Sequence, residues 1–408
     1  MNSTAPVRRL ADWDPRRLRG IAEEYDTPTY VVDLDRIREN LDRLESAFPG
    51  ATVLYAVKAN AGSAVLRTVA EAGAGAECAS AGEVRRALAA GFEPADVQYT
   101  PVNPPDRDLD AVLADGGDSI TVTAGSVDTI DRIAERGFGG AVAIRIHPGT
   151  GAGHSESVAT GADAKFGIPV DRVPDAVETA TARGLSVSGI HAHAGSGILD
   201  EDLDAHRRVV ETVAEVATDL DLSLDFVDVG GGFGVPARPG ESPLSLDAMA
   251  ETIRDTLEDI DATLRIEPGR YVVADAGVLL TRVNTVKPAG EGVVAGVDAG
   301  MTDLLRPALY DAYHPVTSLE GDVREPASVT VVGPVCESTD VLARDRQLPA
   351  PQRGDLLAVG QTGAYGIEMA SQYNSRPRPP VVAMDGQTSR LVRRREDLAD
   401  ITATEVHP

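Results

Sequence analysis

Apolar residues follow two alternating periods along the first two thirds of the chain. Short β-branched runs, typical of buried strands, are followed by stretches in which apolar residues recur with helical spacing. The strand-like runs lie near 53–57, 75–79, 97–100, 119–123, 141–146, 187–193, 226–229 and 263–266, and the helical stretches include 64–72, 81–90, 127–136, 174–183, 202–217 and 246–259. This alternation predicts a (β/α)₈ TIM-like barrel. A doubly wound open sheet is the alternative, and the count of eight units argues against it.

The pattern changes near residue 270. Segments 272–274, 277–285, 292–297, 328–332 and 355–359 have strand character, with glycine and proline turns and little helix between them. We therefore predict an α/β chain with two domains: a barrel at 33–275 and a C-terminal β-rich domain (sandwich or barrel) at 276–408. The N-terminal segment 1–32 is assigned to the second domain through its strand at 29–32.

Charge excludes some classes of partner. The chain has 64 acidic and 38 basic residues and a formal charge of −26, so neither nucleic acid nor an anionic membrane is an expected partner. Only Lys58, Lys165 and Lys287 are lysines, and aromatic residues make up 4% of the chain. These features favour a protein adapted to a high-salt cytoplasm, where salt screens self-repulsion. An ordinary acidic protein is the alternative.

Cysteine content and hydropathy indicate the compartment. The two cysteines, Cys78 and Cys336, do not make a disulfide framework, which fits a reducing cytosol. The N-terminus has no apolar signal region, and no apolar run reaches membrane-spanning length. We therefore expect a cytoplasmic protein without a membrane partner.

One lysine lies where a nucleophile would be useful. Lys58 follows the apolar strand near 53–57. A dry interior lowers the pKa of an amine and frees it to react. A lysine that extends its ammonium into solvent is the alternative. In a chain that uses arginine almost everywhere else, a retained lysine favours a role that only an amine can perform.

Further polar residues follow the other predicted barrel strands. In such barrels the active site lies at the carboxyl ends of the strands. Those ends carry Glu77, His147, His191 with His193, the glycines 230–232, and Glu267 followed by Gly269 and Arg270. An amine, imidazoles, a glycine-rich turn, a carboxylate and a guanidinium thus converge on one rim.

The glycines and histidines on this rim suggest a phosphorylated planar ligand. Glycines 230–234 can turn backbone N–H groups toward a phosphate, although a plain tight turn is the alternative. His191 and His193 alternate along a strand, so they should point to opposite faces. This argues against a two-histidine metal site, and we expect no metal. His193 could lie flat on a planar cofactor, with Ser196 reaching its phosphate; either histidine could instead be a core imidazole.

Together these groups indicate pyridoxal 5′-phosphate as the cofactor. The lysine would hold it covalently, and the carboxylate would keep its ring nitrogen protonated so that the ring accepts electrons.

The same residues resemble a known family. The motifs are 55–60, 77–80, 165–167, 191–197, 230–234, 267–270, 336–338 and 363–365. In this order they resemble the alanine-racemase-fold amino-acid decarboxylases, over residues 28–384. Within that group, segments 303–314, 334–338 and 373–379 resemble the diaminopimelate decarboxylases and differ from the ornithine and arginine branches.

The resemblance implies a role for each site residue. Lys58 binds the cofactor, His193 stacks on its ring, and Glu267 pairs with the ring nitrogen. The phosphate is held by Ser196, Gly231, Gly232, Gly269, Arg270 and Tyr365. Arg270, Arg306 and Tyr310 bind the substrate's distal carboxylate, Glu337 binds its distal ammonium, and Tyr365 also contacts the substrate. Cys336 is the implied proton donor, with a buried structural thiol as the alternative. Cys336 and Glu337 are implied to reach the neighbouring subunit's site, which makes a homodimer with shared active sites.

The implied activity is decarboxylation of meso-diaminopimelate to L-lysine, the last step of lysine biosynthesis. Arg306 beside Tyr310 is the discriminating feature, because an arginine clamp suits a distal carboxylate that stays on the substrate; a surface arginine before a structural proline is the alternative. The other candidate functions are a decarboxylase for another basic amino acid or a carboxylated polyamine, and a non-catalytic regulatory paralogue.

Overall fold

The chain forms two compact units. The computed structural model describes residues 6–149, 152–153, 165–220, 222–290, 292–321 and 324–406. One unit, the barrel unit, consists of residues 38–236 and 242–272. The other, the β-rich unit, consists of residues 1–37, 237–241 and 273–408. The glycine-rich loop at 150–164, which the sequence singles out, lies largely outside the described residues.

The barrel unit is a closed ring of parallel strands. Its strands are β2 (Thr52–Ala56), β3 (Gly75–Cys78), β4 (Val97–Tyr99), β5 (Thr121–Ala124), β6 (Ala141–His147), β9 (Ser186–His191), β11 (Phe226–Asp228) and β12 (Thr263–Ile266). They follow the order β5-β4-β3-β2-β12-β11-β9-β6, and pairing of β5 with β6 closes the ring. The short strands β8 (Ile168–Pro169), β7 (Ala152–Gly153) and β10 (Gly195–Ser196) lie beyond it in the pairing scheme. The predicted (β/α)₈ barrel is confirmed.

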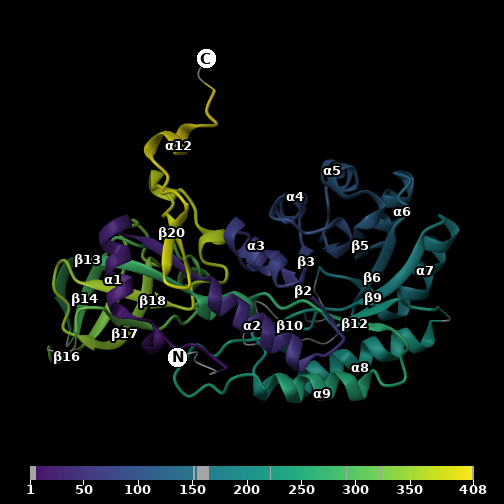
Figure 1. Ribbon diagram of the computed structural model, residues 1–408, viewed down its shortest axis with the longest axis horizontal. Coiled ribbons are helices and arrows are strands. Elements are labelled where there is room, and N and C mark those ends of the chain that lie inside the picture. The colour runs from purple at the N-terminus through teal and green to yellow at the C-terminus, as the bar shows by residue number, and fades with distance from the viewer. Residues whose placement is uncertain are drawn as a thin grey trace. The chain divides into compact units, whose positions relative to one another are not determined.

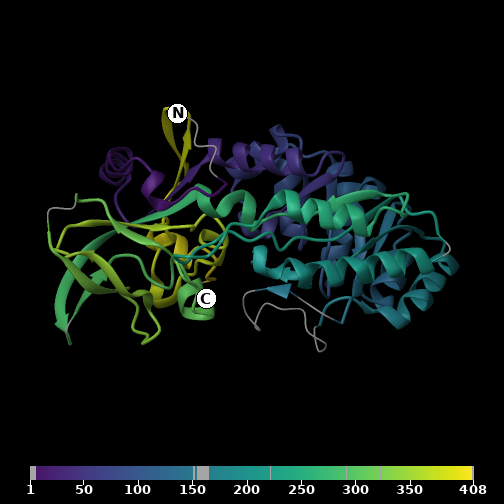
Figure 2. The same ribbon diagram turned by 90° about the horizontal axis from the view of Figure 1, so that it is seen from below.

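Helices surround these strands (Figures 1 and 2). They are α3 (Ser63–Glu71), α4 (Ala81–Ala90), α5 (Asp106–Gly116), α6 (Val127–Glu135), α7 (Val173–Ala182), α8 (Leu203–Asp219) and α9 (Leu246–Thr256). Serine side chains at 80, 126 and 245 cap three of them by accepting a backbone N–H. Helix α5, which the sequence analysis did not list among its examples, buries Leu109, Val112 and Gly116.

The β-rich unit is built on a mixed sheet. The strands are β1 (Thr29–Asp33), β13 (Gly277–Ala289), β14 (Gly292–Val297), β15 (Val316–Ser318), β16 (Pro326–Val332), β17 (Val341–Pro349), β18 (Leu356–Gly360), β19 (Val381–Asp385) and β20 (Thr388–Arg393). Their path is β17-β16-β14-β13-β1-β19-β20, with β18 paired to β13 and β15. Strand β1 pairs antiparallel with β13 and parallel with β19, so the N-terminal strand is part of this sheet.

One sequence prediction for this region is wrong. Residues 272–274 form no strand: they belong to α10 (Arg270–Val273) and the following 3₁₀ turn (Ala274–Ala276). The tertiary setting overrides the β propensity of their valines. The N-terminal segment also contains a helix that the sequence analysis did not identify, α1 (Pro15–Tyr25), capped by Asp14. Its Leu18, Ile21 and Ala22 enter a core with Val31 and Val278. Helices α11 (Arg306–Tyr310) and α12 (Leu398–Thr402) complete the unit.

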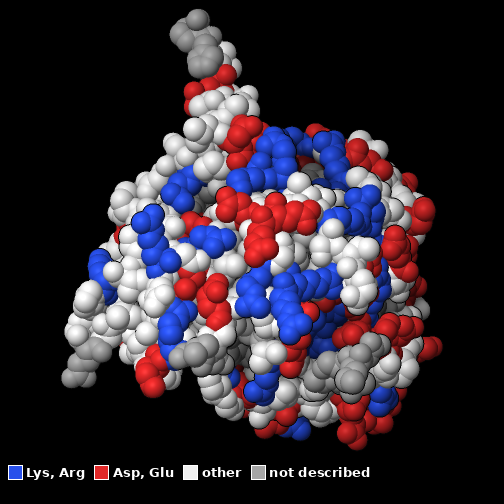
Figure 3. Space-filling model, turned by 60° about the vertical axis from the view of Figure 1, so that its left-hand side comes forward, with Lys and Arg blue, Asp and Glu red and all other residues white. Residues whose placement is uncertain are grey.

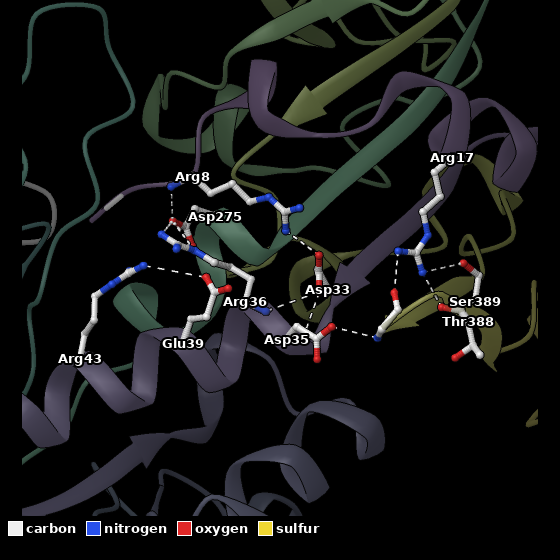
Figure 4. Close-up of polar contacts among 11 residues, drawn as sticks. Arg8, Arg17, Asp33, Asp35, Arg36, Glu39, Arg43, Asp275, Thr388 and Ser389 are labelled. Atoms are coloured by element: carbon white, nitrogen blue, oxygen red, sulfur yellow. Dashed lines mark hydrogen bonds and ion pairs between the residues drawn. The ribbon is translucent and has the colours of Figure 1, made fainter. Parts of the chain in front are cut away.

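A buried ion pair fastens the start of α2 (Leu34–Ala47) within the β-rich unit (Figure 4). Arg36 Nη2 lies 2.7 Å from Asp275 Oδ2, and the two side chains are 1% and 2% exposed. The same carboxylate oxygen accepts the backbone N–H of Arg8 at 2.8 Å. Arg8 in turn stacks over Trp13 and pairs with Asp33. One carboxylate therefore fixes both the N-terminal segment and the helix.

Replacing Asp275 by alanine should lower the free energy of unfolding by about 3–5 kcal/mol, because it leaves the Arg36 guanidinium buried without its counter-ion. Trp13 is 4% exposed and is the chain's single tryptophan, so its fluorescence during denaturant unfolding reports on the β-rich unit. The control is Arg107→Ala, whose side chain is 88% exposed beside Asp108 and whose loss should cost less than about 0.5 kcal/mol. Equal losses of unfolding free energy in the two variants would contradict a stabilising role for the Arg36–Asp275 ion pair.

Candidate active site

The lysine predicted as nucleophile lies at the carboxyl end of its strand. Lys58 is the middle residue of the 3₁₀ turn (Val57–Ala59) that ends β2. Its Nζ lies 2.5 Å from Glu77 Oε2, and the two side chains are 38% and 2% exposed. Glu77 comes from β3, the neighbouring strand. The amine is thus held by a buried carboxylate at the rim, and it is not simply extended into solvent.

A cluster of buried carboxyl groups lies beside it. Glu267 follows β12 and is 3% exposed, and Asp228 at the end of β11 is fully buried. Gln98 of β4 donates from Nε2 to Asp228 Oδ2 at 2.7 Å and to Glu267 Oε1 at 3.2 Å. Its carbonyl oxygen accepts from Arg265 Nη1 at 2.7 Å. A hydrogen-bonded chain, Arg265–Gln98–Glu267, therefore fixes the carboxyl group that was predicted to face the cofactor nitrogen.

Burial controls the protonation of this cluster. It raises the pKa of Glu267 to about 8, with further repulsion from Glu77. It raises the pKa of Asp228 to about 7, where Glu267 adds repulsion. It lowers the pKa of His191 to about 4. His191 Nε2 lies 3.2 Å from Glu267 Oε1, but the two atoms are not aligned as a hydrogen bond. We interpret this pair as a contact between a neutral imidazole and a carboxyl group that retains its proton, and not as a salt bridge.

The same three residues meet the geometric minimum for a metal site. One ligand atom from each of His191, Asp228 and Glu267 lies within 4.8 Å of the others. Gln98 already donates to both carboxyl groups, and the raised pKa values favour proton retention over metal coordination. The absence of a metal stays a prediction.

The glycine-rich turn after β11 is shaped by close backbone contacts. A Cβ on Gly231 would lie 2.2 Å from the Glu267 carbonyl oxygen, and one on Gly232, where φ is +98°, would lie 2.6 Å from Ile198. Gly231 N donates to His193 Nδ1 at 3.2 Å. Only glycine fits these positions, and the turn brings its backbone against the predicted ring-stacking histidine.

His193 and the predicted phosphate ligands lie around this turn. Strand β9 ends at His191. The expectation that His191 and His193 point to opposite faces of one strand therefore does not apply, because His193 lies beyond the strand. Burial and the charge of Lys58 lower the pKa of His193 well below its usual value, which leaves the imidazole neutral. Arg270 Nη2 donates to Ser196 Oγ at 3.1 Å. Gly269 packs against Ala56, where a Cβ would approach to 3.0 Å.

The β-rich unit brings together three further predicted site residues. The Arg306 guanidinium carbon lies 5.8 Å from the ring centroid of Tyr310 and 5.6 Å from that of Tyr365. Arg306 is 7% exposed and Tyr310 is 39% exposed. Tyr365 has a φ of +56°, an uncommon backbone conformation for a bulky residue. Arg306 is therefore a buried guanidinium between two phenol rings and not a surface arginine.

Cys336 and Glu337 are exposed on the β-rich unit. Asn374 Oδ1 accepts hydrogen bonds from the Cys336 backbone N at 3.2 Å and from its Sγ at 3.3 Å. Tyr373 donates its hydroxyl to Glu337 Oε1 at 2.5 Å. The alternative of a buried structural thiol is wrong for Cys336, whereas Cys78 is a buried free cysteine. The segment presents a thiol and a carboxylate outward in a fixed orientation.

Part of this polar network was missed in the sequence analysis. Gln98 and Asp228 were not identified, and Glu77 was placed on the rim without its contact to Lys58. The available signal is a polar residue inside a short buried strand, as in Val97-Gln98-Tyr99 and Phe226-Val227-Asp228. Buried polar groups need partners, so such residues in neighbouring strands of a closed barrel are candidates for one network.

The barrel residues fit pyridoxal phosphate. Lys58 supplies an amine, Glu267 a carboxyl group able to hold a proton near neutral pH, and His193 a neutral ring. The glycine turn with Ser196 and Arg270 supplies the N–H, hydroxyl and guanidinium donors that a phosphate requires.

Comparison with known proteins agrees with this chemistry. The family model described as "Pyridoxal-dependent decarboxylase, pyridoxal binding domain" matches residues 34–274. The chain is 42% identical to diaminopimelate decarboxylase of Methanothermobacter thermautotrophicus, covering 93% of this chain and 92% of that protein. It is 35% identical to the Aquifex aeolicus enzyme of the same name, again covering 93% and 92%.

Solved structures give the same result. The crystal structure of diaminopimelate decarboxylase from Helicobacter pylori complexed with L-lysine superposes with a TM-score of 0.89 at 33% identity, covering 95% of this chain and 98% of that one. The chain therefore belongs to the pyridoxal-dependent decarboxylases and, within that class, to the diaminopimelate decarboxylase family. Lysine/ornithine decarboxylase from Vibrio vulnificus, at 23% identity and a TM-score of 0.81, shares the fold.

The cofactor-free protein should lose stability as the pH rises from 6.5 toward 8. In this window folded Glu267 and Asp228 retain protons that the unfolded chain has released, so the folded state binds more protons and rising pH favours unfolding. Below 6.5 the buried histidines oppose this trend, because their lowered pKa values mean that the unfolded chain binds protons there.

Denaturant unfolding followed by circular dichroism at several pH values in that window measures the slope. Glu267→Gln should flatten it, because an amide does not titrate. Glu93→Gln, an exposed position of the same unit, should keep the wild-type slope. A Glu267→Gln slope equal to wild type would show that this carboxyl group is not the source.

Proposed function

We propose that this protein decarboxylates meso-2,6-diaminopimelate to L-lysine and carbon dioxide, the last step of lysine biosynthesis. The observation that carries the proposal is Arg306, buried between the rings of Tyr310 and Tyr365 in a family whose cofactor serves amino-acid chemistry. A guanidinium can bind a carboxylate through two parallel hydrogen bonds. Diaminopimelate has a second carboxylate that survives the reaction, whereas ornithine has only an ammonium at that end.

Each barrel residue has a distinct task toward the cofactor. Pyridoxal phosphate supplies, when bound, a ring that accepts the electrons released as the carboxylate leaves. Lys58 holds it through its amine, and Glu267 keeps a proton at the ring nitrogen. His193 packs against the ring as a neutral imidazole. Ser196, Arg270 and the backbone N–H groups of Gly231 and Gly232 bind the phosphate, with Gly269 shaping the turn.

The residues of the β-rich unit bind the substrate in this proposal. Arg306 and Tyr310 bind the distal carboxylate, Glu337 accepts the distal ammonium, and Tyr365 also binds the substrate. The departing carboxylate should meet few cations, because a salt bridge there would stabilise the ground state and slow the reaction. An arginine at the far end of the substrate binds the carboxylate that stays and leaves the departing carboxylate without a cationic partner.

We also propose a homodimer with shared active sites. Cys336 would deliver a proton from Sγ to the substrate carbon after carbon dioxide leaves, and Glu337 would bind the substrate of the neighbouring subunit. The exposure of both residues on an ordered, hydrogen-bonded segment supports this role.

The cellular setting is proposed from composition. No helix among the described residues has the length and apolarity needed to cross a membrane. Acidic and basic side chains intermix on the face shown in Figure 3, within a chain whose formal charge is −26. We propose a cytoplasmic protein that tolerates high salt, since salt screens the repulsion among such charges.

The purified protein, loaded with pyridoxal phosphate in high salt, should release carbon dioxide from meso-diaminopimelate and not from L-lysine, L-ornithine or L-arginine. Arg306→Gln should reduce kcat/KM for diaminopimelate by about 10²-fold or more, because it removes a charge-assisted bidentate contact. The control is Arg390→Gln, an exposed position on β20, which should leave it unchanged.

Each alternative gives a different result in the same assay. Turnover of ornithine or arginine would mean that Arg306 is no carboxylate clamp, and the fold and cofactor class would stand. Turnover of a carboxylated polyamine would indicate the polyamine branch. A protein that binds no pyridoxal phosphate and turns over none of these substrates would be a non-catalytic regulatory paralogue.

Mixing Lys58→Ala and Cys336→Ala proteins should restore activity that neither has alone. In a random mixture, half the dimers are mixed, and one of the two sites in each mixed dimer has both native residues. Activity should recover to roughly one quarter of wild type. Unmixed samples of each variant at the same total concentration are the controls. No recovery after subunit exchange, confirmed by tagged-subunit pull-down, would contradict shared sites.

A further inference from the structure

A cavity lies within the β-rich unit. Its volume is about 360 Å³, and three arginines, Arg238, Arg344 and Arg346, line it with Tyr313. The arginines come from distant parts of the chain. Arg238 belongs to segment 237–241, which follows barrel strand β11 in sequence but folds with the β-rich unit. Arg344 and Arg346 lie on β17.

Two of these guanidiniums converge on one aromatic ring. The guanidinium carbon of Arg346 lies 3.7 Å from the Tyr313 ring centroid, and that of Arg238 lies 5.2 Å from the same centroid. Contact with the ring face orients the planar guanidiniums and leaves their N–H edges available. Burial and repulsion by Arg238 lower the pKa of Arg346. Two cations held this close need a nearby negative charge.

That negative charge is largely missing from the protein itself. Across the ranges that the structure describes, no ion pair involves Arg238, Arg344 or Arg346, and Arg346 Nε is buried without a hydrogen-bond partner. Asp311 is the single acidic residue among those lining the cavity, and Asp345, next to Arg346 in sequence, acts to raise the pKa of Arg346. In a chain with 64 acidic residues against 38 basic ones, a cavity with this excess of positive charge is unusual.

The cavity is distinct from the proposed substrate clamp. Both involve α11, but the clamp residues Arg306 and Tyr310 are four positions apart and share one side of the helix. Other residues of this segment line the cavity: Pro307, Ala308 and the capping residue Asp311. Their positions in the sequence place them on a different side of the helix from Arg306 and Tyr310. The two guanidinium groups on Tyr313 therefore serve a different pocket.

We propose that this cavity binds a small multivalent oxyanion, a metabolite that carries a phosphate or several carboxylates. Guanidinium N–H groups match the paired oxygens of both groups. The volume lies within the range of small-molecule sites. This site is independent of the decarboxylase reaction, because the residues that form it take no part in the proposed chemistry.

Isothermal titration of the pyridoxal-phosphate-loaded protein with inorganic phosphate and with citrate, at constant ionic strength set by chloride, tests the proposal. We expect saturable binding of at least one anion. Arg346→Gln and Arg238→Gln should each weaken it by about 10-fold or more, because each removes a charged donor. Arg238 is exposed, so its replacement should not disturb folding. Arg390→Gln should bind as wild type.

The outcomes separate the possible occupants. Binding of phosphate without citrate indicates a phosphorylated ligand, and the reverse indicates a polycarboxylate; either supports the proposal. Absence of saturable binding overturns it, as does binding lost in Arg306→Gln but kept in Arg346→Gln, which would locate the anion on the substrate clamp. Light scattering is the second readout. If Arg346→Gln and Arg238→Gln instead change the oligomeric state without affecting anion binding, the cavity is a subunit contact and the proposal is wrong.

Discussion

Closure of the barrel by the pairing of β5 with β6 is the constraint on which the site depends. A closed ring of parallel strands leaves no free edge, so every strand ends at one rim and every inward side chain shares one interior. Residues as distant in sequence as Lys58, Glu77, Asp228 and Glu267 meet for this reason. The same closure removes water from the interior, so its polar groups must satisfy one another.

The carboxyl cluster shows how the interior accommodates charge. Asp228 and Glu267 are almost fully buried, and three ionised carboxylates with Glu77 would repel one another strongly. Raised pKa values let Asp228 and Glu267 keep their protons near neutral pH, while Glu77 stays next to the Lys58 ammonium. Gln98 can donate to both carboxyl groups in either protonation state. When pyridoxal phosphate is bound, a proton transferred from Glu267 to the ring nitrogen would leave the carboxylate as the counter-charge of the protonated ring.

The β-rich unit uses arginine in another way. Arg306 lies between Tyr310 and Tyr365, and Arg346 stacks on Tyr313 beside Arg238. Aromatic rings orient a guanidinium without neutralising it. Arg36 differs from both, because its charge is balanced by Asp275 inside the fold. In a strongly acidic chain, arginines held against aromatic rings mark where we expect anions.

The sequence by itself determined the barrel, the strand-end positions of Lys58, His193 and Glu267, and the family. Strand and helix periods are local signals, and the site motifs directly follow the strands. The sequence did not determine the secondary structure of residues 272–274 or the presence of α1. At 272–274 packing overrode the local β propensity, and in α1 packing against the core supplied the stability that local propensity lacked. Only the tertiary structure decided that Glu77 holds Lys58, that Gln98 links Asp228 to Glu267, and that Arg238 joins Arg346 on one ring. These contacts join residues far apart in the chain, and their pairing depends on barrel closure and strand register, which no local pattern encodes.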